Sequence, residues 1–413
     1  MPAPRPPADA PDADPADRPD ADRPAGAAPP IGVLKGRGSA WAIAHRFEGR
    51  TREWADDGWW AGEGEREAGG EGAGEHTATD AAAPAPRPVA TEVRVELARR
   101  ILSRNDSPDV PFELAINPYR GCEHGCIYCY ARPTHSYLNL SPGLDFETRL
   151  IAKTNAAERL RAELAQPGYR PSPINLGSAT DAYQPIERQW RLTRALLEVL
   201  DEVRHPATIV TKSGAIARDL DLLGRMAARQ QLLVFISVTT LDVRLSRILE
   251  PRAAAPQRRL AAIRALAGAG VWVGVNVAPI IPFINEPEIE QILAAAAEAG
   301  ARSAHWTVLR LPWEVNPLFQ HWLAEHVPDR AERVMARIRE MRGGRDYDAD
   351  FRQRMKGAGV WAQLIRQRME IGAARVGLAR AVPTLDVSAF VPPPAPRPAP
   401  KPAREPPPQA SLF

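Results

Sequence analysis

Residues 113–133 read ELAINPYRGCEHGCIYCYARP, a short apolar run followed by a loop that carries Cys122, Cys126 and Cys129. These are the only 3 cysteines among 413 residues. An odd number of closely spaced thiols makes a poor disulfide framework, whereas thiolates are good ligands for soft metals. The stretch therefore predicts a metal-binding loop directly after a buried strand.

Five further apolar runs, rich in β-branched residues, follow the first one along the chain. Each has the length and composition of a buried strand. Stretches with helical spacing, such as 188–204, separate them, and alternating strands and helices predict a parallel sheet. Six units are fewer than the eight that close a full barrel, so we expect an α/β fold with a partial, open (β/α)6 TIM-like barrel. The six runs are 113–117, 172–178, 207–212, 232–240, 271–278 and 305–311.

Polar residues stand at or just after the end of each predicted strand. In a barrel of parallel strands these ends meet at one face, where binding and catalytic residues gather. A single serine or asparagine there is more often a satisfied turn residue, but polar residues at all six ends indicate a site. They are the cysteine loop, Ser178 with Asp181, Thr211 with Lys212, Ser237 with Thr239, Asn276, and Arg310.

Two kinds of metal site fit three thiolates. A structural zinc ion takes four ligands, and His124 or His135 could supply the fourth. An iron–sulfur cube held by three cysteines instead leaves one iron open to a substrate or cofactor. All the thiols lie in one loop rather than in two separated halves, which favours the cluster and makes His124 a loop residue.

The spacing C-x3-C-x2-C, with Tyr128 before the last cysteine, resembles the signature of radical S-adenosylmethionine (radical SAM) enzymes. The resemblance implies a 4Fe-4S cluster on Cys122, Cys126 and Cys129, with S-adenosylmethionine on the open iron. It also implies reductive cleavage of S-adenosylmethionine to a 5′-deoxyadenosyl radical, which abstracts hydrogen from a substrate. An electron donor of the flavodoxin or ferredoxin type is then an expected partner.

Residues 113–311 are similar to an uncharacterised bacterial branch of this superfamily that is related to spore photoproduct lyase. The similarity includes VTKS at 210–213 and NVAPIIPFIN at 276–285. It implies that Lys212 binds the carboxylate of S-adenosylmethionine, that hydroxyls and an amide bind its amine or ribose, and that Tyr128 lies near the adenine. For Tyr128 and Ser237, core packing is the alternative. The implied contacts are Tyr128, Ser178, Lys212, Ser237 and Asn276.

The chain departs from spore photoproduct lyase in its cysteines. That enzyme uses an additional cysteine as hydrogen donor, and this chain has no thiol beyond the three in the loop. The same shortage excludes radical SAM classes that need a second cluster or catalytic thiols. Tyr183, close to Asp181 after the second run, is a candidate donor in its place, with a loop-structural role as the alternative for both.

Composition divides the chain into a barrel and its flanks. Stretches dominated by Pro, Gly, Ala and charged residues bury too little apolar surface to offset ordering entropy. We expect a disordered segment at 1–30, an N-terminal extension at 31–112 with a low-complexity stretch at 60–92, the radical SAM core at 113–311, a C-terminal helical extension at 312–380 and a Pro-rich disordered tail at 381–413.

The sequence carries no run of about eighteen apolar residues and no apolar leader segment. We therefore expect a cytoplasmic protein without a membrane partner. The net charge of +3 does not by itself indicate a nucleic-acid partner. The Arg-rich stretch 337–357 does predict a basic lip beside the barrel.

Three functions are compatible with these observations. The first is radical SAM chemistry on DNA or another nucleic acid, which the lyase resemblance and the basic lip favour. The second is the same chemistry on a small molecule or peptide, and the third is a zinc-bound interaction protein without catalysis. The chain ends in QASLF, which is similar to the short peptides that dock on the bacterial DNA sliding clamp, with Gln409, Leu412 and Phe413 as contacts.

Overall fold

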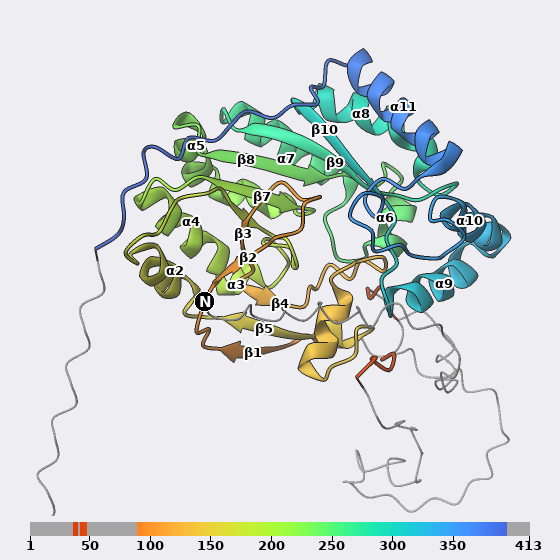
Figure 1. The fold of residues 1–413 in the computed structure, drawn as a ribbon, viewed down its shortest axis with the longest axis horizontal. Coiled ribbons are helices and arrows are strands. Elements are labelled where there is room, and N and C mark those ends of the chain that lie inside the picture. The colour runs from red at the N-terminus through yellow and green to blue at the C-terminus, as the bar shows by residue number, and fades with distance from the viewer. Residues whose placement is uncertain (1–35, 40–41, 48–88, 395–413) are drawn as a thin grey trace, which may run out of the picture.

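The computed structural model describes residues 36–39, 42–47 and 89–394. Its main element is a seven-stranded sheet with the strand order β10-β9-β8-β7-β6-β3-β2 (Figure 1). Six of these strands run parallel, and β2 adds an antiparallel edge. The strands are β2 (Leu102–Arg104), β3 (Leu114–Ile116), β6 (Ile174–Leu176), β7 (Ala207–Thr211), β8 (Leu232–Ser237), β9 (Trp272–Ile280) and β10 (Ser303–Val308).

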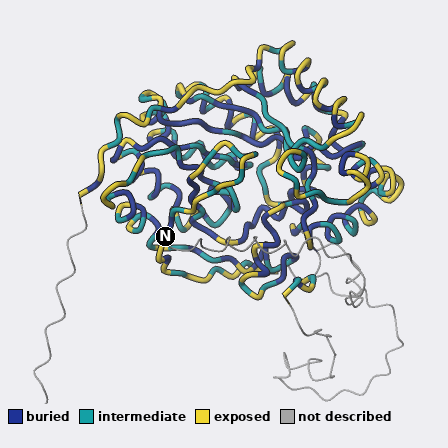
Figure 2. Tube along the Cα trace, viewed as in Figure 1, coloured by how far each residue is buried: buried dark blue, intermediate teal, exposed yellow. Residues whose placement is uncertain are grey.

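The six parallel strands overlap the six runs predicted from the sequence, although β9 ends two residues later than its run and β10 begins two residues earlier. In the described part of the chain, β10 and β2 are the two edges and do not pair, so the barrel is open as expected. The strands are the buried centre of the molecule (Figure 2) because their Val, Ile and Leu side chains are covered on both faces. The predicted open (β/α)6 architecture is confirmed.

Helices between the strands form a layer over one face of the sheet, each packed against the next along the chain. Each one buries an apolar stripe, as α4 does with Leu196, Leu197 and Leu200. The layer leaves the opposite face of the sheet to the cysteine loop. Its helices are α2 (Ala156–Leu164), α4 (Leu192–Glu202), α5 (Leu220–Ala228), α7 (Pro256–Gly268) and α8 (Ile289–Glu298). Shorter helices are α1 (Asp145–Thr148), α3 (Glu187–Trp190) and α6 (Val243–Leu249).

A small second sheet supports the cysteine loop. Its strands are β1 (Glu92–Glu96), β5 (Arg149–Lys153) and β4 (Tyr119–Arg120), in the order β1-β5-β4. β4 lies just before the loop and β5 follows it, while β1 comes from the N-terminal extension. The extension therefore contributes to the framework that holds the loop.

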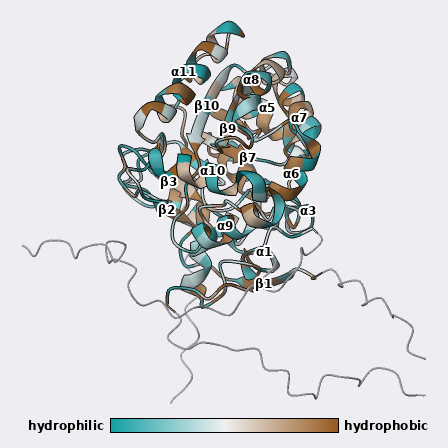
Figure 3. Cartoon of the chain, turned by 90° about the vertical axis from the view of Figure 1, so that its right-hand side faces the viewer, coloured by the Kyte–Doolittle hydropathy of each residue, from teal (hydrophilic) through white to brown (hydrophobic). Residues whose placement is uncertain are grey.

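The C-terminal extension contains the helices α9 (Val315–His326), α10 (Pro328–Glu340) and α11 (Gly359–Arg375). α11 packs on α8 and carries both hydrophobic and hydrophilic bands (Figure 3). The connection between α10 and α11 returns to the open edge of the barrel. There the Val308 amide donates to the Met355 carbonyl at 2.9 Å, and Arg354 pairs with Asp109 at 2.6 Å.

Residues 381–394, the beginning of the stretch expected to be a tail, lie against the barrel. The Asp386 amide donates to the Gln230 carbonyl at 2.9 Å, and the Val391 amide donates to the Val203 carbonyl at 3.0 Å. The expected disordered segment 1–30 and residues 395–413 lie outside the described residues. No helix in the described part of the chain combines the length and the apolar character needed to cross a bilayer.

Candidate active site

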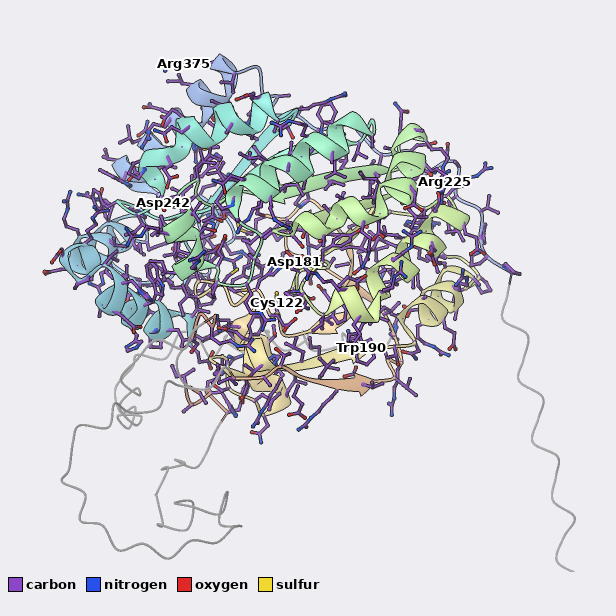
Figure 4. All side chains as sticks on the ribbon, turned by 180° about the vertical axis from the view of Figure 1, so that it is seen from behind. Cys122, Asp181, Trp190, Arg225, Asp242 and Arg375 are labelled. Carbon is purple, nitrogen blue, oxygen red and sulfur yellow. The ribbon has the colours of Figure 1, made fainter. Side chains whose placement is uncertain are left out.

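A cavity of about 640 Å³ lies where the parallel strands end. Every parallel strand contributes a lining residue at or near its C-terminal end, so side chains far apart in sequence meet there. Figure 4 labels Cys122 and Asp181, two of the lining residues, in the middle of the molecule. All eight binding residues proposed from the sequence line it: Cys122, Cys126, Cys129, Tyr128, Ser178, Lys212, Ser237 and Asn276.

The three thiols are free and face this one cavity. Burial raises the pKa of the Cys122 thiol well above its ordinary value, and the charges of Asp181, Cys126 and Cys129 add to the effect. Burial likewise raises the pKa of Cys126. Three neighbouring thiols, two of them buried, are a donor set that suits a soft metal centre, because metal binding replaces the thiol protons.

Gly125 lets the loop turn between the first two cysteines. Its φ of 66° lies in the left-handed region, and a Cβ atom there would be 2.7 Å from Glu147 Oε2. The space around this turn is therefore already filled by the carboxylate.

A buried ion pair of Arg132 and Glu147 supports the cysteine loop. Arg132 donates to the carbonyl oxygens of Cys126 at 2.9 Å and Gly125 at 3.2 Å, so its guanidinium holds the loop backbone directly. Glu147 also accepts the Ser39 amide at 2.9 Å, which attaches the N-terminal segment to the same support. The sequence analysis did not identify either residue, because nothing local distinguishes them from surface charges.

A second buried network reaches the loop from the other side. The Tyr128 hydroxyl donates to Glu250, which also forms a buried ion pair with Arg259 of α7. Arg259 donates in turn to the Ser237 carbonyl at 3.1 Å. This network supports the packing alternative for the Tyr128 hydroxyl, although its ring still lines the cavity. Nothing in the local sequence singles out Glu250, and its burial is what reveals its role.

The backbone around Glu250 also pairs with the cysteine loop. The Ile127 amide donates to the Leu249 carbonyl at 3.1 Å, and the Arg252 amide donates to the His124 carbonyl at 3.2 Å. These bonds tie the loop to the segment between α6 and α7. The position of the thiols is thus set by contacts on several sides.

Comparison with known proteins agrees with this geometry. Residues 116–296 match the family described as the radical SAM superfamily. The chain is 37% identical over 234 residues to an uncharacterized protein of Mycobacterium bovis, an alignment that covers 56% of this chain and 68% of that protein. The chain belongs to the radical SAM superfamily.

Other relatives are more distant. A Methanocaldococcus jannaschii protein, also uncharacterized, is 26% identical over 217 residues, 52% of this chain and 77% of that protein. A solved structure of a spore photoproduct lyase variant is similar with a TM-score of 0.46 and 18% identity, over 71% of this chain and 86% of that one.

As a radical SAM enzyme, the protein uses a 4Fe-4S cluster and S-adenosylmethionine. The described residues fit both groups. The thiols supply three soft ligands from one loop. Among the described residues, no three or more His, Cys, Asp or Glu side chains are placed so that they could hold a single metal ion. Lys212 supplies a cation beside them.

The Lys212 ammonium is available for a ligand of this radical SAM site. It lines the cavity 5.9 Å from the centre of the Tyr128 ring, and within the described ranges it makes no hydrogen bond or ion pair. Burial alone would lower its pKa, but the charges of Cys126 and Glu250 raise it, so the group stays protonated. A free cation in this position suits a carboxylate.

The side chains of Ser178, Ser237 and Asn276 differ in whether they already have a hydrogen-bond partner. Ser237 and Asn276 are paired neighbours on β8 and β9, and within the described residues their side chains make no hydrogen bonds. Ser178 accepts a hydrogen bond from Asn117 at 2.9 Å. Ser237 and Asn276 are therefore the freer groups to contact S-adenosylmethionine.

The histidines do not favour the zinc alternative. His124 lies 3.3 Å from Asp181, and this contact and hydrogen bonds lower the pKa of Asp181, although burial would raise it. His135 does not line the cavity, and its Nε2 lies 3.0 Å from the Arg149 carbonyl. Asp181 also accepts the Thr211 hydroxyl at 2.6 Å and so has a structural role in joining strand ends.

Tyr183, the candidate hydrogen donor, is not a lining residue of the radical SAM cavity. It is 1% exposed and its hydroxyl donates to Asp219 at 3.1 Å, so the loop-structural alternative fits it better. Tyr130, which directly follows the last cysteine, does line the cavity and is 48% exposed. The predicted basic lip also reaches the cavity, through Arg354.

Proposed function

We propose that this radical SAM enzyme acts on a nucleic acid, with DNA as the first candidate substrate. The observation that carries the proposal is the combination of groups that line one cavity. Three thiols and an unpaired Lys212 line it together with Arg104, Arg310, Arg354 and the Tyr130 ring. When bound, the cluster supplies an electron that cleaves S-adenosylmethionine to the hydrogen-abstracting 5′-deoxyadenosyl radical.

The chain's own residues would bind and orient S-adenosylmethionine. Lys212 binds the carboxylate as a charge partner, while Ser237 and Asn276 offer hydrogen bonds to the amine or the ribose. Ser178 and the Tyr128 ring also line this cavity, one as a polar group and the other as an aromatic surface. The barrel interior below them is closed by buried aliphatic side chains, which keeps a reactive species away from water.

A second cavity of about 780 Å³ adjoins the first and shares Arg104, Asn105 and Phe112 with it. A groove that continues beyond the reacting centre suits a strand longer than the nucleotide that reacts. Arg104 is the cation of the second cavity, which Asp106 and Glu113 also line. The stretches 210–213 and 276–285, which resemble spore photoproduct lyase, contribute lining residues to the first cavity. Together these features favour a nucleic-acid substrate.

A small molecule or peptide is the second candidate. The volume of the main cavity, about 640 Å³, lies within the range of ordinary small-molecule sites. The same radical chemistry would serve it, so only the substrate separates the two functions.

Turnover assays distinguish these candidates. The full chain is reconstituted anaerobically with iron and sulfide, reduced, and incubated with S-adenosylmethionine plus DNA, RNA or a metabolite extract. We expect DNA to increase 5′-deoxyadenosine formation, or deuterium from labelled DNA to appear in the 5′-deoxyadenosine. Stimulation by the extract alone would support the small-molecule function. A colourless protein with stoichiometric zinc, unchanged in Cys126→Ala, would contradict the placement of the cluster on the three cysteines.

The QASLF peptide lies outside the described residues. We propose that Gln409, Leu412 and Phe413 dock the enzyme on the DNA sliding clamp, with the preceding Pro-rich stretch as a spacer. Docking would raise the effective concentration of the enzyme on DNA. A reductant of the flavodoxin or ferredoxin type remains the expected electron donor.

A further inference from the structure

Arg310 stands just after β10 and lines the cavity. Its guanidinium carbon lies 5.0 Å from the centre of the Tyr130 ring. Nη2 is 3.4 Å from the Tyr347 hydroxyl, and Nη1 is 3.7 Å from the Met355 sulfur, which is a weak acceptor. Nε is buried and has no hydrogen-bond partner.

Three other buried or partly buried arginines near the site are paired with carboxylates, and the buried Arg342 donates to the carbonyls of Leu309 and Gln353. Arg354 pairs with Asp109, Arg132 with Glu147 and Arg259 with Glu250. Arg310 forms no ion pair with any carboxylate in the described ranges. A half-buried guanidinium with an unsatisfied N–H costs free energy unless a ligand supplies the acceptor.

Arg310 and Lys212 face different aromatic rings of the cavity wall. The Lys212 ammonium lies 5.9 Å from the centre of the Tyr128 ring. Arg310 instead lies next to Tyr130, whose hydroxyl donates to the Ser178 carbonyl and so holds the ring at the cavity wall. A guanidinium beside a half-exposed aromatic ring is a pair suited to a phosphate and the base attached to the same nucleotide.

We propose that Arg310 binds a backbone phosphate of the substrate, with the neighbouring base stacked on Tyr130. Arg310 thereby determines where the strand lies relative to the reacting centre. This inference rests on the proposed function, and it names the substrate group that the free guanidinium recognises. Arg104, which lines both cavities, is the next cation along the strand.

The test measures binding rather than turnover. The full, anaerobically reconstituted chain is titrated into fluorescein-labelled hexathymidylate, and anisotropy gives the Kd. A series of the same oligonucleotides carries one neutral methylphosphonate linkage, moved along the strand. We expect one linkage position to weaken wild-type binding about tenfold or more, because a charge-assisted hydrogen bond is lost.

Arg310→Gln should weaken binding of the unmodified strand by a similar factor and no longer distinguish that neutral linkage. Arg310→Lys should recover part of the discrimination, because it restores the charge without the bidentate geometry. Arg380→Gln is the matched control, since Arg380 is exposed, pairs with Glu370, and lies outside both the basic lip and the cavity lining. Iron content and circular dichroism verify that each variant is folded and loaded.

The outcomes separate this inference from the proposed function. Retained affinity and discrimination in Arg310→Gln would overturn the inference, while DNA-stimulated formation of 5′-deoxyadenosine would leave the function standing. Thymidine 5′-monophosphate is the second probe. If it binds only when Arg310 is present, and hexathymidylate does not bind, the phosphate contact stands and the DNA function fails. Absence of binding to either probe by the wild type overturns both.

Discussion

Arg132 donates from Nε to the carbonyl oxygen of Cys126 at 2.9 Å, and its guanidinium is fully buried. The loop that carries the thiols is therefore held by its backbone, while its sulfur atoms remain free to bind iron. Glu147 compensates the charge of Arg132. The support and the ligands are separate groups, so they can be changed independently.

Arg132→Met should destabilise the protein by about 3–5 kcal/mol, because Glu147 is left as an unpaired buried charge. Iron content after reconstitution should fall with it. Urea unfolding and iron analysis measure both effects. Arg120→Met is the control, since Arg120 is exposed and pairs with Glu96 at 3.6 Å, and we expect it to cost less than about 1 kcal/mol. Equal losses in the two variants would refute the supporting role.

The pKa of Glu250 gives a pH prediction. Burial would raise this pKa, but the charges of Arg259 and Lys212 and hydrogen bonds from Arg259 and Tyr128 lower it from 4.5 to about 2. Stability from this group is complete above the unfolded value of 4.5 and is lost as the pH falls toward 2. The free energy of unfolding should therefore decrease across this window in the wild type.

Glu250→Gln should remove this group's share of the pH dependence and be less stable at pH 7, while Asp181, Asp201 and Asp221, whose pKa values are also lowered, titrate in both proteins. Burial lowers the pKa of both His135 and His205 from 6.5 to about 4, so stability that depends on the neutral imidazoles is lost as the pH falls from 6.5 to 4 in both proteins and serves as an internal reference. Denaturation curves at several pH values check the difference. A wild type and variant with parallel pH profiles below pH 4.5 would contradict the assigned network.

Lys212→Met should keep the cluster colour but weaken S-adenosylmethionine binding by about 1.5–3 kcal/mol, because a charge-assisted contact with carboxylate is lost. Calorimetry on the reconstituted protein measures the affinity. Lys356→Met is the comparison, since Lys356 packs on Trp306 and does not line the cavity. Unchanged affinity in Lys212→Met would make that lysine structural.

Gly38 packs directly against the cysteine loop. A Cβ atom there would lie 1.8 Å from the Gly125 carbonyl oxygen, so Gly38→Ala must displace the N-terminal segment from Glu147. We expect faster loss of iron to a chelator under anaerobic conditions. Gly268→Ala, in α7 with nothing within 4 Å of its added methyl group, should leave the rate unchanged. Identical rates in both would show that the segment does not support the cluster.

The proposed clamp contact can be tested with a peptide spanning residues 400–413. It should bind the purified sliding clamp with micromolar affinity, because Leu412 and Phe413 offer apolar anchors. The matched peptide has both anchors changed to Ala and should not bind. Equal binding, or none, by the two peptides would remove clamp docking as support for a DNA substrate.

The sequence by itself determined the sheet and the ligand loop. Six apolar runs separated by helical stretches were enough for the open barrel, because strand burial and helix periodicity are local patterns. The polar strand ends were enough to nominate Lys212, Ser237 and Asn276, because parallel strands bring their ends to one face. The three cysteines were recognisable from spacing alone.

The tertiary structure alone decided which polar residues are occupied and which are free. Glu250 and Arg132 support the cysteine loop through partners remote in sequence, and burial, which no short window of sequence reports, is what makes these ion pairs consequential. The Tyr183 hydroxyl donates to Asp219 and Tyr183 does not line the cavity, whereas Arg310 has no carboxylate partner among the described residues. Whether a charge is satisfied depends on every group that folding brings within reach of it, and that is a property of the packed chain.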